Sequence, residues 1–100
     1  MSPRARLDDR TIAAFVSSSG WAREEDGLVR TFAFSRYGEG LGFAVAVGVE
    51  ADKADHHPDL FIGWCKVRVR WSTHDAGGIT QLDLDLATLT QALAAARISS

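Results

Sequence analysis

The sequence is poor in residues that mark several classes of protein: it holds one cysteine and two prolines, and it has no long apolar run. A single cysteine excludes an internal disulfide and a cysteine-rich zinc site, so we expect a reducing, cytoplasmic setting. The longest apolar stretch, residues 41–49, is broken by Gly42 and Gly48 and is far shorter than the ~20 residues of a membrane span. The charged start, MSPRARLDD, lacks the apolar segment of a signal peptide. We therefore expect neither export nor membrane insertion.

Basic residues are not in excess either, since 11 Lys and Arg face 13 Asp and Glu, for a net charge of -2. Nucleic-acid binding usually requires a basic surface, so we expect no nucleic-acid partner.

A length of 100 residues with 46% hydrophobic residues is typical of one globular domain, and we interpret residues 1–100 as a single domain. Domains of this length bury only about 60 to 70% of their unfolded surface, so homo-oligomerisation would be an effective way to bury more.

The first half of the chain predicts a helix, a hairpin and a second helix. Residues 7–21, LDDRTIAAFVSSSGW, space apolar side chains at nearly helical intervals and end in Ser-Ser-Ser-Gly, which predicts a helix. Residues 21–35, WAREEDGLVRTFAFS, place a Glu-Asp-Gly turn between two extended segments and predict a β-hairpin. The small and apolar run within residues 36–54 fits a buried strand or a buried helix, and the length of the segment and its alanine-rich tail favour a helix.

The second half predicts a strand and a final helix. Residues 66–73, KVRVRWST, alternate apolar with basic side chains, which predicts a strand with one face on a core and one in water. Residues 80–98 predict an amphipathic helix because leucines recur at offsets of four, three and four: Leu82, Leu86, Leu89 and Leu93. The order α-β-β-α-β-β-α is typical of an α+β domain in which helices cover an antiparallel sheet.

Four side chains are candidates for chemistry: His56, His57, His74 and Asp83. The histidine pair precedes the third predicted strand and His74 ends the fourth, so all three imidazoles can meet at one end of a hairpin, within reach of Asp83. Structural roles compete with this interpretation. Pro58 biases His57 toward an extended backbone, in which one of two neighbours is simply solvated. Asp83 has a structural role as well, because Thr-x-x-Asp at residues 80–83 resembles a helix capping box.

Three kinds of chemistry fit these residues to different degrees. Three histidines and a carboxylate are suitable metal ligands, but adjacent ligands are awkward in an extended segment. A triad of Ser72, His74 and Asp83 has no nucleophile elbow, and Cys65 lies inside a strand pattern. Acid–base catalysis by imidazole needs neither metal nor nucleophile, because its pKa of about 6.5 lets it give and take protons near neutral pH. The residues favour this third chemistry, without metal or cofactor.

A set of fragments resembles the pterin-4a-carbinolamine dehydratase family over about residues 7–93. The fragments are GW at 20–21, LVRTFAF at 28–34, ADKADHHPDLF at 51–61, KVRVRWSTHDAGGIT at 66–80 and LDLDLA at 82–87. The resemblance implies a four-stranded antiparallel sheet with three helices packed on one face, assembled as a homodimer or homotetramer. It implies loss of water from a 4a-hydroxytetrahydropterin, such as that of biopterin, to give the quinonoid dihydropterin.

The resemblance also implies roles for individual residues. His56 and His74 would be acids facing the 4a-hydroxyl, and His57 would hold the substrate and act as the base. Trp64 would supply an aromatic ring that the family often carries elsewhere in the segment. Four side chains would bind substrate: Asp83, Asp52, Thr73 and Trp64.

A second function remains open on the same scaffold. The family includes dimerisation cofactors of a transcription factor and dehydratase-like proteins associated with carboxysome and Rubisco assembly. Residues 60–65 differ from the usual family pattern, which leaves a non-catalytic interaction role open, whereas the intact histidines favour an enzyme.

Overall fold

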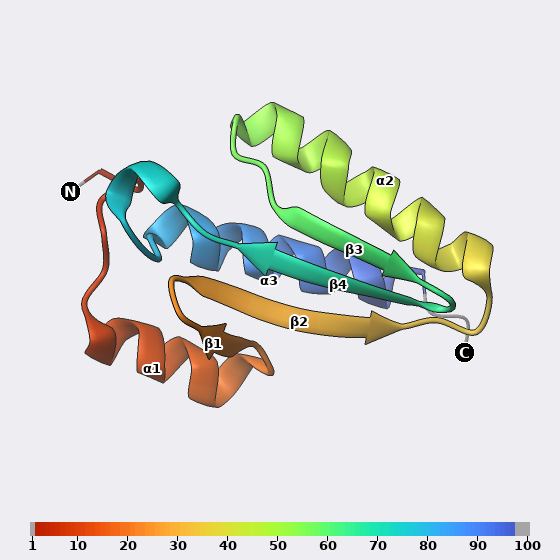
Figure 1. Ribbon diagram of the computed structural model, residues 1–100, viewed down its shortest axis with the longest axis horizontal. Helices are drawn as coiled ribbons and strands as arrows, with labels where there is room; N and C mark the ends of the chain where they lie inside the picture. The colour runs from red at the N-terminus through yellow and green to blue at the C-terminus, as the bar shows by residue number, and fades with distance from the viewer. Residues whose placement is uncertain (1, 98–100) are drawn as a thin grey trace.

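The sheet is organised around β4 (Lys66–Trp71), which pairs on both sides in the computed structural model, where residues 2–97 are described. The strand order is β1 (Ala22–Glu24), β2 (Gly27–Ala33), β4, β3 (Asp59–Gly63), and every pairing is antiparallel. The predicted alternation of β4 is confirmed, because its valines and Trp71 are buried while its basic side chains lie on the opposite face. Figure 1 shows the β3–β4 turn at one end of the sheet and the exit from β4 at the other.

Three helices cover this sheet: α1 (Asp9–Ser19), α2 (Tyr37–Ala54) and α3 (Gln81–Ala95). The helix α3 packs against β2 and β4, and α2 packs against β4 and β3 (Figure 1). Residues 36–54 are thus a helix, as their length and alanine content predict, and the α+β topology is confirmed. Ile98, the last residue of the predicted final helix, lies outside the described residues. No helix within residues 2–97 is long and apolar enough to cross a membrane.

The core joins the apolar face of the sheet to the three helices. Its centre is aromatic, since Phe43 of α2 lies 5.1 Å from the ring of Phe32 and 5.2 Å from that of Phe34. Ile12 contributes the buried side chain of α1. That helix is capped by Asp8, whose carboxylate accepts a hydrogen bond from the Thr11 N–H at 2.9 Å. Hydrogen bonding to Thr11 holds the pKa of Asp8 below its usual value, so this stabilisation is lost as the pH falls through the lowered pKa.

The predicted leucine stripe of α3 faces the core. Leu86 is buried, and the other three predicted leucines are partly buried and pack against the core. Leu84 and two polar side chains, Asp83 and Thr90, are buried beside the stripe. The two polar side chains form hydrogen bonds inside the protein, which offsets the free-energy penalty of burying them.

An N-terminal segment, residues 3–7, connects the ends of two helices. The Leu82 N–H in the first turn of α3 donates to the Pro3 carbonyl at 3.0 Å. At the end of α2, Arg4 Nη2 donates to the carbonyls of Ala54 at 3.0 Å and Asp55 at 3.2 Å. These are carbonyl groups that a helix end leaves without intrahelical partners. The segment therefore ties the end of α2 to the start of α3.

We predict that Arg4→Met lowers the free energy of unfolding by about 1 kcal/mol, because it removes a charged donor from two carbonyls at an exposed site. Urea unfolding measures the change. The matched control is Arg10→Met, which removes an exposed arginine from α1 and should change stability by less than about 0.5 kcal/mol. Equal losses for both variants would contradict the helix-tying role of Arg4.

Candidate active site

The end of α2 sets the direction of the two adjacent histidines. Asp55 caps the helix in the left-handed conformation, with φ 50° and ψ 44°, and the N–H of His56 donates back to the carbonyl of Ala51 at 3.1 Å. This closing turn carries the chain from the helix into β3 and points the two imidazoles in different directions. His56 is 8% exposed, whereas the side chain of His57 is 59% exposed.

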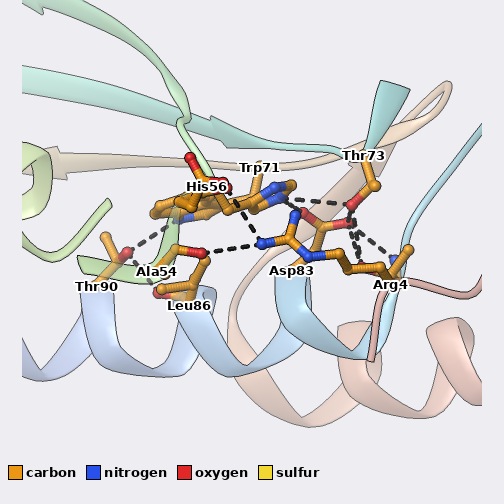
Figure 2. Close-up of polar contacts among 10 residues, drawn as sticks. Arg4, Ala54, His56, Trp71, Thr73, Asp83, Leu86 and Thr90 are labelled. Atoms are coloured by element: carbon orange, nitrogen blue, oxygen red, sulfur yellow. Dashed lines mark hydrogen bonds and ion pairs between the residues drawn. The ribbon is translucent and has the colours of Figure 1, made fainter. Parts of the chain in front are cut away.

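Asp83 is the partner of the buried histidine. Its side chain is fully buried, and its Oδ1 lies 2.6 Å from Nε2 of His56 (Figure 2). Its Oδ2 accepts from Thr73 Oγ1 at 2.7 Å, from the Thr80 N–H at 2.9 Å and from Thr80 Oγ1 at 3.2 Å. The capping box predicted from Thr-x-x-Asp is therefore present, and the same carboxylate also contacts an imidazole.

The hydrogen bonds of Asp83 constrain the tautomer of His56. An ionised carboxylate only accepts, so Nε2 of His56 is the donor toward Asp83. Nδ1 is then left to bind or release a proton. The aromatic face of Trp71 lies alongside the same imidazole, with centroids 5.8 Å apart and planes at 13° (Figure 2).

His57 has a different environment. Its Nε2 lies 2.9 Å from Oδ1 of Asp52, which stands five residues earlier on α2. Both side chains are largely exposed, at 59% and 79%. The expectation that one of the paired histidines is solvated is met by His57, but that imidazole also has a carboxylate partner.

His74 reaches the same hollow from another segment. The strand β4 ends at Trp71, so His74 does not end the strand as predicted but begins a short 3-10 helix, η1 (His74–Ala76). Thr73 forms an isolated bridge with Gly78 that closes this turn. A hollow of about 290 Å³ lies here, and all three histidines line it with five other residues: Arg4, Asp55, Ser72, Thr73 and Asp75. A second hollow, of about 310 Å³, shares Ser72, Thr73 and His74.

The remaining predicted site residues lie at different places. Thr73 is buried, and its hydroxyl is bonded to Asp83. Trp64 is 80% exposed in the turn between β3 and β4, where Cys65 has a positive φ of 56°. This turn is at the end of the hairpin opposite the histidines (Figure 1), so within one chain Trp64 does not join them. Among residues 2–97, no three His, Cys, Asp or Glu side chains are grouped so that they could hold a metal ion.

Arg4 is a residue of the hollow that the sequence did not indicate. It lies 50 and 51 residues from the carbonyls that it binds, and no local pattern connects them. Trp71 was predicted only as a core residue of a strand, because its alternation with basic residues says nothing of which side chain it contacts. A contact between Trp71 and His56 depends on the path of the chain after α2.

Comparisons with known proteins match almost the whole chain to proteins of one kind. A family model described as "Pterin 4 alpha carbinolamine dehydratase" matches residues 5–93. A protein of Natronomonas pharaonis is 55% identical over 82 residues, which cover 82% of this chain and 88% of that protein. One of Thermomicrobium roseum is 45% identical over 84 residues, covering 83% and 90%. Both are named provisionally as pterin-4-alpha-carbinolamine dehydratases.

Solved structures show the same fold. A transcriptional coactivator/pterin dehydratase from Brucella melitensis superposes with a TM-score of 0.84 at 29% identity, over 89% of this chain and 98% of that one. A pterin dehydratase-like protein described as a RuBisCO assembly factor in the alpha-carboxysome superposes with a TM-score of 0.61. Its identity of 21%, over 74% of this chain and 86% of that one, supports a likeness of fold alone.

We predict that Asp83→Asn reverses the hydrogen bond to His56. The amide oxygen can replace Oδ2 as acceptor for Thr80 and Thr73, which turns the NH2 group toward Nε2 of His56. Since two donors cannot share a hydrogen bond, His56 should change to the Nδ1–H tautomer, which ¹⁵N NMR of the imidazole detects. The free energy of unfolding should fall by about 1 to 3 kcal/mol.

The matched control for this prediction is Asp85→Asn, on the exposed side of the same helix, where the carboxylate accepts from Gln81 at 2.9 Å. It should leave the His56 tautomer unchanged. Retention of an Nε2–H imidazole in Asp83→Asn would show that Asp83 does not determine the tautomer.

Proposed function

The chain belongs to the pterin 4 alpha carbinolamine dehydratase family, and we propose that it eliminates water from a 4a-hydroxytetrahydropterin by histidine acid–base catalysis. The observation that carries this proposal is the convergence of three imidazoles on one hollow, with the buried Asp83 behind one of them. The substrate would be a 4a-carbinolamine of the biopterin type and the product a quinonoid dihydropterin. The reaction as proposed requires no cofactor.

The dehydration needs an acid and a base that act close together. The C4a–O bond breaks and the leaving hydroxyl takes up a proton to become water. The ring nitrogen next to C4a loses its proton, and a C=N double bond forms between the two atoms. Charge and atoms balance with one proton delivered and one removed. Imidazoles are suited to both transfers because each can be protonated or neutral near pH 7.

The two carboxylate–imidazole pairs support a division of these roles. His56 would deliver a proton to the hydroxyl together with His74, since Asp83 beside its Nε2 stabilises the protonated ring. His57 would hold the substrate and remove the proton from the ring nitrogen. Asp52 at its Nε2 leaves Nδ1 to accept that proton and stabilises the imidazolium that results, as in other carboxylate-oriented histidines. Asp52 and Thr73 would thus contribute to substrate binding through these orientations.

A non-catalytic role as an interaction or assembly factor is the second candidate. One structural relative is called a transcriptional coactivator as well as a pterin dehydratase. In this chain three large apolar side chains are exposed on and just after the edge strand β3: Phe61, Ile62 and Trp64. An exposed apolar edge is a common place for partner binding.

We also propose that the chain forms a homodimer or homotetramer. Four apolar side chains recur every four residues along the outer side of α2 and are 37 to 67% exposed in the single chain: Tyr37, Leu41, Val45 and Val49. Space around Gly38 and Gly42 is open, which would let a second helix approach closely. Burying this stripe would add apolar contacts to a domain whose own core is small.

We predict that His74→Ala slows carbinolamine dehydration by about 10²-fold or more, which is the usual contribution of a positioned proton-transfer group. The fold should persist, because His74 is exposed on a short 3-10 turn. Stopped-flow absorbance of the carbinolamine measures the rate, and thermal unfolding checks the fold. Asp85→Ala, on the exposed side of α3, is the control and should keep the full rate.

A scaffold without catalysis gives the opposite pattern in this assay. The unmodified protein would then leave the spontaneous rate unchanged, His74→Ala would have no effect, and pterin would not raise the melting temperature. These results together would reject the enzyme and favour the interaction role.

We predict that replacing Val45 and Val49 with Asp halves the mass of the particle in solution or reduces it further. The two valines are already 67% and 49% exposed in the single chain, so the substitutions should disturb assembly more than folding. Light scattering after size exclusion at micromolar concentration measures the mass. Arg10→Glu, on the exposed side of α1, is the control, and a monomeric unmodified protein would contradict the proposed assembly.

A further inference from the structure

The buried imidazole of His56 is held by two different contacts. Asp83 meets its edge at Nε2, at 2.6 Å. Trp71 meets its face, with ring centroids 5.8 Å apart and planes inclined by only 13°. A hydrogen bond at one nitrogen still allows the ring to tilt and to rotate about that bond. A parallel indole face restricts both movements, and its electron-rich surface attracts a protonated imidazole.

Trp71 is itself held in position by α3. Its Nε1–H donates to Thr90 Oγ1 at 3.0 Å, and the Thr90 hydroxyl donates to the carbonyl of Leu86 at 2.6 Å (Figure 2). The indole of Trp71 is 1% exposed and Thr90 is also 1% exposed, so water does not compete for these hydrogen bonds. The chain of donors therefore fixes the indole plane that lies against His56.

Trp21 provides an internal comparison. It is 2% exposed and packs edge-on against Phe32, with centroids 5.9 Å apart, but its Nε1–H has no hydrogen-bond partner among the described residues. A buried indole in this fold is thus tolerated without a partner. The hydrogen bond of Trp71 to Thr90 is a specific feature of the tryptophan that contacts the imidazole.

We propose that Trp71, held by Thr90, is a positioning residue that fixes the ring plane of His56 for proton transfer through Nδ1. This inference rests on the proposed function for its catalytic consequence, but the coupling between indole and imidazole exists without substrate. Thr73 Oγ1 lies 3.5 Å from His56 Nε2, on the side of Asp83. Charged and titratable groups that share the hollow with His56 are Arg4, Asp55, His57, His74 and Asp75.

The first test uses the fluorescence of Trp71, because a protonated imidazole stacked on an indole quenches its emission. Trp21→Phe and Trp64→Phe leave Trp71 as the sole tryptophan. Emission should fall when the pH is lowered far enough to protonate His56. The midpoint should match the NMR titration of His56, and the step should disappear when His56→Gln is added. A flat emission profile, or a step that survives His56→Gln, would overturn the proposal.

The second test uses kinetics with a matched pair of variants. Trp71→Leu should lower kcat roughly tenfold with KM nearly unchanged, because the imidazole is misaligned while the hollow persists. Trp71→Phe restores an aromatic face and should recover most of kcat. Trp21→Leu removes an equally buried indole that does not contact His56, and should keep kcat. Equal losses of kcat in Trp71→Leu and Trp21→Leu, or no recovery with Trp71→Phe, would overturn the proposal.

Two further outcomes are covered by the same experiments. If Trp71→Leu does not fold, Thr90→Val keeps the indole but removes its acceptor, and should weaken the fluorescence step and lower kcat. An unchanged step and an unchanged kcat in Thr90→Val would overturn the proposal. If the unmodified protein does not dehydrate carbinolamine, the proposed function fails while the fluorescence test still decides the coupling of Trp71 to His56.

Discussion

The rest of the site depends on the hydrogen bonds that the buried carboxylate of Asp83 accepts. A charge without exposure to water is strongly unfavourable unless it is hydrogen-bonded, and this one receives hydrogen bonds from the end of β4, the start of α3 and the end of α2. Each partner comes from a different element. The need to satisfy one carboxylate therefore brings three chain segments together at one end of the sheet, and these segments carry the histidines.

Each of the two adjacent histidines contacts a carboxylate, but the two pairs lie in different environments. His56 and Asp83 are shielded from water, so their interaction is strong, whereas His57 and Asp52 are exposed and their attraction is weakened by solvent. One imidazole is thus enclosed by its partners, and the other is open to solvent. An enclosed ring suits a proton transfer that needs exact alignment, and an exposed ring is accessible to a bound molecule.

Sequence patterns predicted what depends on neighbours along the chain. The alternation of β4, the capping role of Asp83 and the meeting of the histidine segments all follow from local spacing and antiparallel pairing. Arg4 could not be predicted because its partners are 50 residues away. The resemblance implies that Trp64 supplies an aromatic ring to the site, but its place in the β3–β4 turn puts it at the opposite end of the sheet.

The polar side chains that α3 buries beside its leucine stripe belong to the polar cluster of the site. Five polar side chains are buried among residues 2–97, and all of them belong to one cluster: His56, Thr73, Thr80, Asp83 and Thr90. Four are joined by hydrogen bonds at Asp83, and Thr90 joins them through the indole that lies against His56. A core chosen for stability alone would fill such positions with apolar groups. Their grouping around Asp83 and Trp71 shows where the fold departs from simple burial, and departures of this kind occur at functional or strained sites.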